Sequence, residues 1–97
     1  MNLGQKIKQI RINEGLTQKK FCELINLPLS TLLKYEAGKF EPGGTALTNI
    51  VKHERFNKYM MWLMTDQTNE AVGQISPTLS PDGQDNKTLS QSERKTG

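Results

Sequence analysis

The amino-acid sequence predicts an all-α fold, with one helical domain over residues 1–66 and a flexible polar tail over residues 67–97. Apolar side chains recur at helical spacing in five segments, which Gly, Pro and Asn residues separate from one another. After Asp66 the chain has no aromatic side chain and is mostly Ser, Thr, Gln, Pro, Gly and charged residues. Such a segment cannot bury enough apolar surface to offset the entropy lost when its backbone is ordered.

The first predicted helix starts near Leu3, because Leu3, Ile7 and Ile10 recur at spacings of three and four while polar side chains occupy the other faces. Gly15 is expected to end it, since glycine tolerates the positive φ that often closes a helix. Thr17 then stands where the next helix needs an N-cap, although a lysine replaces the Glu of a full capping box.

Two short helices are predicted next, and together they form a helix-turn-helix over about residues 18–37. The first of them would bury Phe21, Cys22 and Ile25 on its inner face. Asn26 follows at the break, where a sharp turn requires a residue that tolerates the left-handed conformation.

The second helix of this pair is expected to start after Pro28, which suits a helix start because its missing N–H costs nothing there. Leu27 would fill the angle between the two helices, Leu32 and Tyr35 would be buried, and Gly38 would end the second helix. A helix held at a steep angle to its predecessor can enter the DNA major groove. The motif therefore favours a protein that reads DNA.

A fourth helix is expected after the loop of residues 39–44, in which Pro and Gly are the strongest breakers. Thr45 is the predicted cap of this helix. Leu47, Ile50 and Val51 form its apolar stripe at spacings of three and four.

A fifth helical segment, residues 56–64, carries more apolar surface than one buried face needs. The side chains expected on the buried face are Phe56, Tyr59, Met60 and Leu63. Met61, Trp62 and Met64 would then lie outside. A large exposed tryptophan favours a partner surface.

The formal charge of the chain is +3, and the basic excess lies in the predicted domain. Residues 1–66 contain ten Lys and Arg against six Asp and Glu, whereas residues 67–97 contain three against four. A basic folded part fits a phosphate-binding surface, although many small domains carry a few extra lysines.

Other functional classes find little support in the sequence. Cys22 is the only cysteine and His53 the only histidine, so neither a disulfide scaffold nor a metal site is expected. Without a carboxylate cluster, the chain is not expected to be an enzyme or to bind a cofactor or a small-molecule substrate. No apolar run approaches the ~20 residues of a membrane span, and no apolar signal core is present. We therefore expect a cytoplasmic protein that joins the nucleoid by binding DNA.

The stretch from Leu16 to Lys39, L-T-Q-K-K-F-C-E-L-I-N-L-P-L-S-T-L-L-K-Y-E-A-G-K, resembles the helix-turn-helix of phage repressor and Cro-type proteins. This is the lambda-repressor-like, or XRE-type, family. The most specific parts are L-T-Q at the start and Y-E-A-G at the end, and the similarity extends from Arg11 to about Leu63. The resemblance implies a compact five-helix domain that binds double-stranded operator DNA, usually as a homodimer. Similar domains dimerise near the end of the fifth helical segment, so Met61, Trp62 and Met64 are the predicted dimerisation surface.

The resemblance also implies roles for individual residues. The positions that would face base edges are Leu29, Ser30, Leu33 and Lys34. Thr31 lies beside them and could reach a phosphate. Gln18 would touch the phosphate backbone and brace the reading helix, Lys39 would contact the backbone after that helix, and Lys19 would either bind phosphate or lie on a solvated face.

Arg11 and Glu36 match a pair that forms an internal salt bridge in similar proteins, so both are expected to be structural. Leu29 departs from the family pattern, because its position often holds Gln or Arg. Leucine cannot make the bidentate hydrogen bonds that distinguish bases and can only contact a thymine methyl group or exclude water. Leu33 has the same restriction.

Two hypotheses for function remain. The first is a sequence-specific transcriptional regulator, a phage or prophage repressor that binds a palindromic operator as a homodimer. The alternative is a protein-interaction module, such as an antitoxin or a partner of the transcription machinery, that uses the same helical fold. DNA binding should weaken steeply as salt rises, whereas an apolar protein interface should hardly respond. The operator sequence, and the choice between repression and activation, do not follow from the residues.

Overall fold

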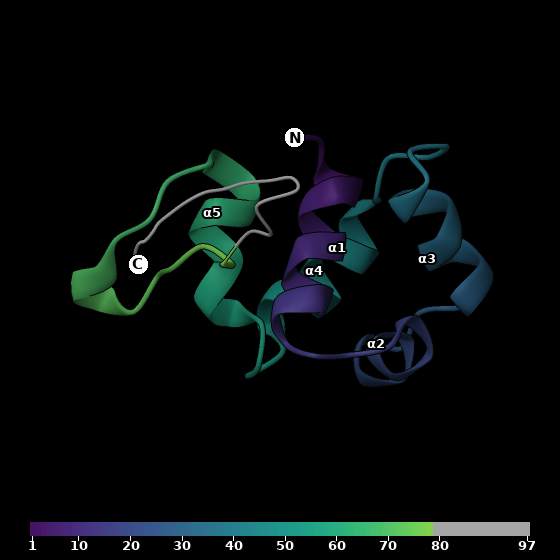
Figure 1. Cartoon of the computed structure of the whole chain (residues 1–97), viewed down its shortest axis with the longest axis horizontal. Helices are drawn as coiled ribbons and strands as arrows, with labels where there is room; N and C mark the ends of the chain where they lie inside the picture. The colour runs from purple at the N-terminus through teal and green to yellow at the C-terminus, as the bar shows by residue number, and fades with distance from the viewer. Residues whose placement is uncertain (79–97) are drawn as a thin grey trace.

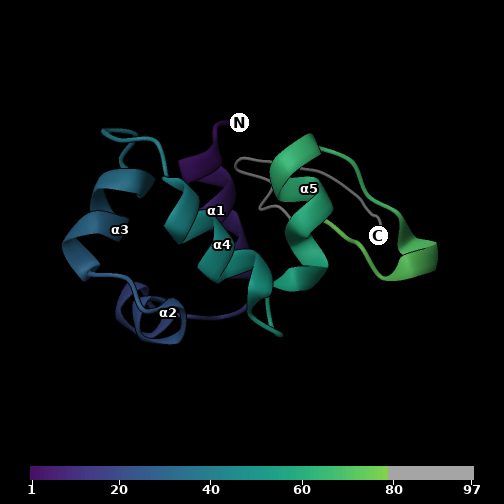
Figure 2. The same cartoon turned by 180° about the vertical axis from the view of Figure 1, so that it is seen from behind.

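The computed structural model describes residues 1–78, which contain five α-helices, two short 3-10 helices and no strand (Figure 1). The elements in chain order are α1 (Leu3–Asn13), α2 (Gln18–Ile25), α3 (Leu29–Glu36), α4 (Gly44–Lys52), η1 (Asn57–Tyr59), α5 (Met60–Thr65) and η2 (Glu70–Val72). This confirms the predicted all-α fold with five helices. α3 and α5 lie towards opposite ends of the molecule, with α1 and α4 between them (Figures 1 and 2).

Residues next to the helix ends determine where α1 begins and ends and where α2 begins. The Asn2 side chain accepts a hydrogen bond from the Gln5 N–H at 2.8 Å, and the Gln5 side chain accepts one from the Asn2 N–H at 3.0 Å. This reciprocal capping box was not anticipated from the sequence. Gly15, at φ 71°, follows α1 as predicted. Thr17 caps α2 as predicted, accepting a hydrogen bond from the Lys20 N–H at 3.1 Å.

The turn between α2 and α3 has the predicted form. Asn26 is left-handed, at φ 57° and ψ 51°. The N–H of Leu27 donates to the carbonyl of Cys22 at 3.0 Å, and Pro28 occupies the N-cap of α3 at φ −62°. In Figure 1 α2 is seen almost end-on and α3 from the side, so the two helices cross at a steep angle.

A single core joins the helices, and all five contribute to it. Its buried members are Ile7, Ile10, Phe21, Cys22, Ile25, Leu32, Ile50, Phe56, Tyr59, Trp62 and Leu63. Burying side chains of this size stabilises the fold by about 1.5–3 kcal/mol each before entropy is subtracted. α3 contributes only Leu32 to this core, so most of its surface remains available for other contacts.

The predicted start of the fourth helix was wrong by two positions. α4 begins at Gly44, and Gly43 is its N-cap at φ −85° and ψ 175°. The carbonyl of Gly43 accepts the first helical hydrogen bond, from the N–H of Leu47 at 3.0 Å. Thr45 therefore lies inside the first turn, where its side chain makes no cap bond.

The predicted faces of the fifth helical segment were also partly wrong. Met60 was expected inside but is 45% exposed, whereas Trp62 was expected outside but is only 9% exposed. The reason is that the segment starts as the 3-10 helix η1, which has about three residues per turn. Phe56, Tyr59 and Trp62 consequently follow one another on the buried side, and Leu63 lies next to them.

Residues 67–78 pack against the helices, although their composition predicted the start of a flexible tail. The Gln74 side chain hydrogen-bonds to the backbone at the start of α5 and in η1, at 2.9 and 3.0 Å. The N–H of Ile75 donates to the carbonyl of Lys58 at 2.9 Å, and its side chain packs on the core. The folded part therefore extends past residue 66, because specific hydrogen bonds supplement sparse apolar contacts. The remainder of the predicted tail, residues 79–97, lies outside the described residues.

Candidate nucleic-acid interface

α3 presents two rows of side chains to solvent, each formed by residues four positions apart, which share a helix face. The first row is Leu29 and Leu33, which are 42% and 43% exposed. The second row is Ser30 and Lys34, both exposed. Thr31 is half-buried. The structure therefore brings together the five α3 positions expected to face DNA, with an apolar row next to a polar one.

Glu36, in the last turn of α3, ties this helix to α1 and α2. Arg11 makes a bidentate ion pair with it, at 2.8 Å from Nε to Oε2 and 3.1 Å from Nη2 to Oε1. Gln18 Nε2 donates to Glu36 Oε1 at 3.0 Å. The Glu36 side chain is only 5% exposed, so these bonds are shielded from solvent. The structure thus contains the internal salt bridge and the brace by Gln18, and both fix the orientation of α3.

Gly4 permits a close approach between α1 and α3. A Cβ atom at this position would lie 2.0 Å from the carbonyl oxygen of Tyr35 and 2.9 Å from its carbonyl carbon. Backbone atoms cannot move aside cheaply, so only glycine allows this contact. This role of Gly4 was not predicted from the sequence. The available signal was a glycine inside a helix. Such a glycine costs roughly 1 kcal/mol relative to Ala, so its presence indicates a packing requirement.

The chain turns back sharply after α3. Gly38, at φ 79°, donates its N–H to the carbonyl of Tyr35 at 3.1 Å, and the N–H of Lys39 donates to the carbonyl of Lys34 at 2.9 Å. These two bonds make a Schellman motif. They bring Lys39, which is exposed, and Phe40 back towards the last turns of α3.

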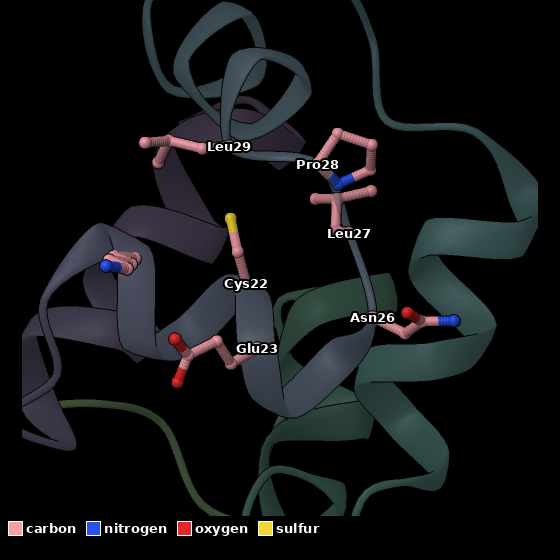
Figure 3. A pocket seen from close by; sticks show the side chains of 7 residues that line it. Cys22, Glu23, Asn26, Leu27, Pro28 and Leu29 are labelled. Carbon is pink, nitrogen blue, oxygen red and sulfur yellow. The ribbon is translucent and has the colours of Figure 1, made fainter.

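An open pocket of about 490 Å³ lies at the turn of the helix-turn-helix (Figure 3). Lys19 and Leu29 line it from α2 and α3, and Figure 3 shows the sulfur of Cys22 directed towards the turn. Burial raises the pKa of the Cys22 thiol. This thiol therefore packs as a small apolar group, since a reactive cysteine needs its thiolate form.

Not every basic side chain is available to a ligand. Lys6 is buried, and its Nζ donates to the carbonyls of Trp62 and Leu63 at 3.2 Å each and pairs with Asp66 at 2.5 Å. It therefore satisfies the carbonyls at the end of α5, where a positive charge is also favoured. This role was not predicted, because the partners lie more than fifty positions away in the sequence.

A second internal network surrounds Glu14 at the end of α1. Its carboxylate accepts hydrogen bonds from Arg55 Nε at 3.2 Å and from the Tyr59 hydroxyl at 2.6 Å, and it pairs with Lys58 Nζ at 3.0 Å. Burial alone would raise the pKa of Glu14, but the bonds from Tyr59, Lys58 and Arg55 outweigh it and lower the pKa. Burial and the bond to Glu14 raise the pKa of Tyr59 to about 12.

The residues predicted for dimerisation do not form one exposed patch. Trp62 belongs to the core, Met61 is half-buried, and Met64 is 52% exposed. Met60 and Met64 lie four positions apart on α5, so the exposed face of this helix carries these two methionines instead.

Other site chemistry is not evident in the described part of the chain. Residues 1–78 contain no group of three or more His, Cys, Asp or Glu side chains that could hold a metal ion. Over the same residues, every helix is too short or too polar to cross a membrane.

Comparisons with known proteins agree with this geometry. A family model described as helix-turn-helix matches residues 7–53, which include α2 and α3. The chain is also 36% identical over 95 residues to Repressor protein C of Escherichia phage P2, a match that covers 98% of this chain and 96% of that protein. The chain therefore belongs to the helix-turn-helix family of phage repressors and is a DNA-binding transcriptional regulator of that type.

Proposed function

We propose that this regulator is a phage or prophage repressor that binds a palindromic operator in double-stranded DNA as a homodimer. The observation that carries the proposal is the solvent-facing side of α3, a helix held rigidly by Glu36 yet contributing only Leu32 to the core. A preorganised helix with one free face is what entry into the major groove requires.

Each row of α3 would contact DNA differently. Leu29 and Leu33 would meet thymine methyl groups, since leucine offers no hydrogen bond to a base edge. Ser30 would contact a base edge and Lys34 a guanine, whose O6 and N7 atoms accept hydrogen bonds in the major groove. Thr31 is proposed to reach a phosphate.

Phosphate contacts would come from the ends of α2 and α3. Gln18 and Lys19 open α2, and Lys39 follows the Schellman motif beyond α3. Such contacts position the protein on the duplex without reading sequence, and they make its affinity depend on salt.

The proposed dimer uses the exposed face of α5, with Met60 and Met64 as its centre and Met61 beside them. Trp62 would support this face from inside rather than touch the partner. Because α5 lies at the end of the molecule away from α3, a two-fold axis beside it would separate the two reading helices widely (Figures 1 and 2). Successive major grooves on one side of DNA require a separation of about 34 Å.

The proposed mechanism is steric. A dimer on an operator that overlaps a promoter would exclude RNA polymerase, with neither a cofactor nor a small-molecule ligand. The family consists of DNA-binding repressors rather than a known class of enzyme, and we extend this to the absence of catalysis in this chain. The protein would act in the cytoplasm, at the nucleoid.

A second candidate, a protein-interaction module, is favoured by one observation. Leu29 and Leu33 expose an apolar row on the proposed reading face. The two functions differ in salt response, because phosphate binding weakens steeply between low and moderate salt and an apolar protein interface does not.

Selection of binding sites from a random duplex library tests the proposal, with Lys34→Ala selected in parallel. We expect a two-fold-symmetric consensus from the wild-type chain, containing a G·C pair whose preference the variant loses. T-rich half-sites would support methyl contacts by Leu29. A library that shows no enrichment at low salt would refute DNA reading and leave a protein partner of the Leu29 and Leu33 row as the better explanation.

A further inference from the structure

Phe40 is a large aromatic side chain that lies outside the core. It lies in the loop that follows α3, is 58% exposed and is not a member of the core cluster. An exposed aromatic ring beside a binding surface suggests a role in recognition rather than in folding.

The Schellman motif at the end of α3 determines where this ring lies. Gly38 and Lys39 turn the backbone so that the next residue, Phe40, lies beside the third-last residue of the helix, Lys34. The Lys34 ammonium nitrogen is 5.2 Å from the centre of the Phe40 ring. This distance is within the ~6 Å over which a cation is attracted to an aromatic face.

Lys34 has this ring as its neighbour instead of a carboxylate. The ion pairs in the described part of the chain use Lys6, Arg11, Lys20, Arg55 and Lys58. A lysine side chain has a flexible four-carbon stem. Holding it in one geometry to form a hydrogen bond therefore costs conformational entropy. A ring on one side of the ammonium restricts the stem and leaves its N–H donors free on the opposite side.

We propose that Phe40 is a positioning residue that holds Lys34 in place to recognise a guanine and thereby sets the base preference at that step of the operator. The proposal rests on the proposed function, namely that α3 reads DNA. Lys34 shares its row with Ser30 on the exposed face, so an ammonium held at this place faces the major groove rather than the core. Phe40 itself has no polar side-chain atom and cannot hydrogen-bond to a base.

The test is a double-mutant cycle on the full chain, with Phe40→Leu, Lys34→Ala and the combined variant. Affinity is measured on the duplex selected by the wild-type chain and on the same duplex with the relevant G·C pair changed to A·T. We expect Phe40→Leu to weaken binding to the selected duplex by about two- to fivefold. It should have little effect on the A·T duplex or in the Lys34→Ala background, and Phe40→Tyr should retain the wild-type preference.

The ratio of the two affinities is the decisive readout, because it does not depend on how much of a variant is folded. An equal loss in both Lys34 backgrounds would show that Phe40 contacts DNA by itself, and tighter binding by Phe40→Leu would show that the ring holds Lys34 away from DNA. Either result would overturn the role proposed for Phe40 but would leave intact the proposal that α3 reads DNA. A Lys34→Ala variant with unchanged affinity and preference would instead remove Lys34 from the proposed reading face and refute both proposals.

Discussion

The two ends of this molecule are stabilised in different ways. At the α3 end, one buried carboxylate, Glu36, gathers Arg11 and Gln18 and leaves the outer face of the helix open. At the α5 end, Lys6 crosses from α1 to cap the helix, and residues 67–78 close over it. The comparison indicates that α3 depends on contacts gathered at one carboxylate, whereas the opposite end depends on contacts spread over several residues.

The largest expected effect is at Glu36. Glu36→Ala should lower the free energy of unfolding by about 3–5 kcal/mol, because it leaves the largely buried guanidinium of Arg11 without its counter-charge. Urea denaturation followed by circular dichroism measures this loss. Glu23→Ala is the matched control, since Glu23 is exposed and lies 3.8 Å from Lys20; a surface pair of this kind contributes about 0–1 kcal/mol. Similar losses of unfolding free energy in the two variants would show that Glu36 is not the main support of α3.

The corresponding change at the other end is Lys6→Ala. It removes hydrogen bonds to two carbonyls and an ion pair, so we expect a loss of about 1.5–3 kcal/mol. The Lys6 ammonium lies 5.3 Å from the Trp62 ring centre, and α5 should loosen first. Tryptophan fluorescence should therefore change at lower urea concentration than circular dichroism does. Coincident transitions would argue against separate stabilisation of the two ends, and Lys8→Ala, at an exposed site on α1, is the control.

Gly4→Ala tests the contact between α1 and α3, the proposed reading helix. The added methyl group would overlap the carbonyl of Tyr35 and force α3 away from α1, at an expected cost of about 1–3 kcal/mol. Because this displacement moves the reading face, affinity for the selected duplex should fall while the emission of Trp62 stays unchanged. An unaltered affinity would mean that α3 is held without this close contact. Gly44→Ala is the control, since nothing lies within 4 Å of its added Cβ atom.

The smallest expected effect is on the stability of the fold at acidic pH. The folded-state pKa of Glu14 is lowered, so its bonds to Tyr59, Lys58 and Arg55 stabilise the fold above the ordinary carboxyl pKa of 4.5. That contribution should disappear as the pH falls from 4.5 through the lowered value. The effect is moderate because the Arg55 and Lys58 side chains are each 41% exposed.

Comparing the urea midpoints of wild type and Glu14→Gln between pH 7 and pH 3 tests this prediction. The difference between the two proteins should shrink on acidification, and a constant difference would exclude Glu14 as the titrating group.

Local signals in the sequence sufficed for most of the helix-turn-helix. Thr17 caps α2 with its side chain, and Asn26 and Gly38 adopt the left-handed backbone that their residue types predict. The same reasoning failed at Thr45, where Gly43 supplied the cap, and at Trp62, where a 3-10 turn shifted the buried face. These errors arise because helix type and exact starting residue depend on the packing of the whole domain.

Long-range partners were beyond sequence reasoning. Lys6 lies among the polar positions of the first helix, and the composition around Gln74 and Ile75 predicts a flexible segment. Their partners became apparent only once α1, η1 and α5 lay next to one another. The exposed side of α3 was easier to predict, because its residues follow one another within a single helix.

The internal use of basic side chains limits how many salt ions this regulator can displace from DNA. Lys6, Arg11, Arg55 and Lys58 each have a carboxylate at 3.1 Å or less. Of the ten basic residues in residues 1–66, this leaves Lys8, Lys19, Lys20, Lys34, Lys39 and Lys52 to neutralise phosphates. Each neutralised phosphate releases roughly 0.9 of a condensed counterion, so the described part of one subunit can release at most about five. The number of basic residues in the sequence thus overstates the ionic component of DNA affinity, and shape and apolar contacts must supply the remainder.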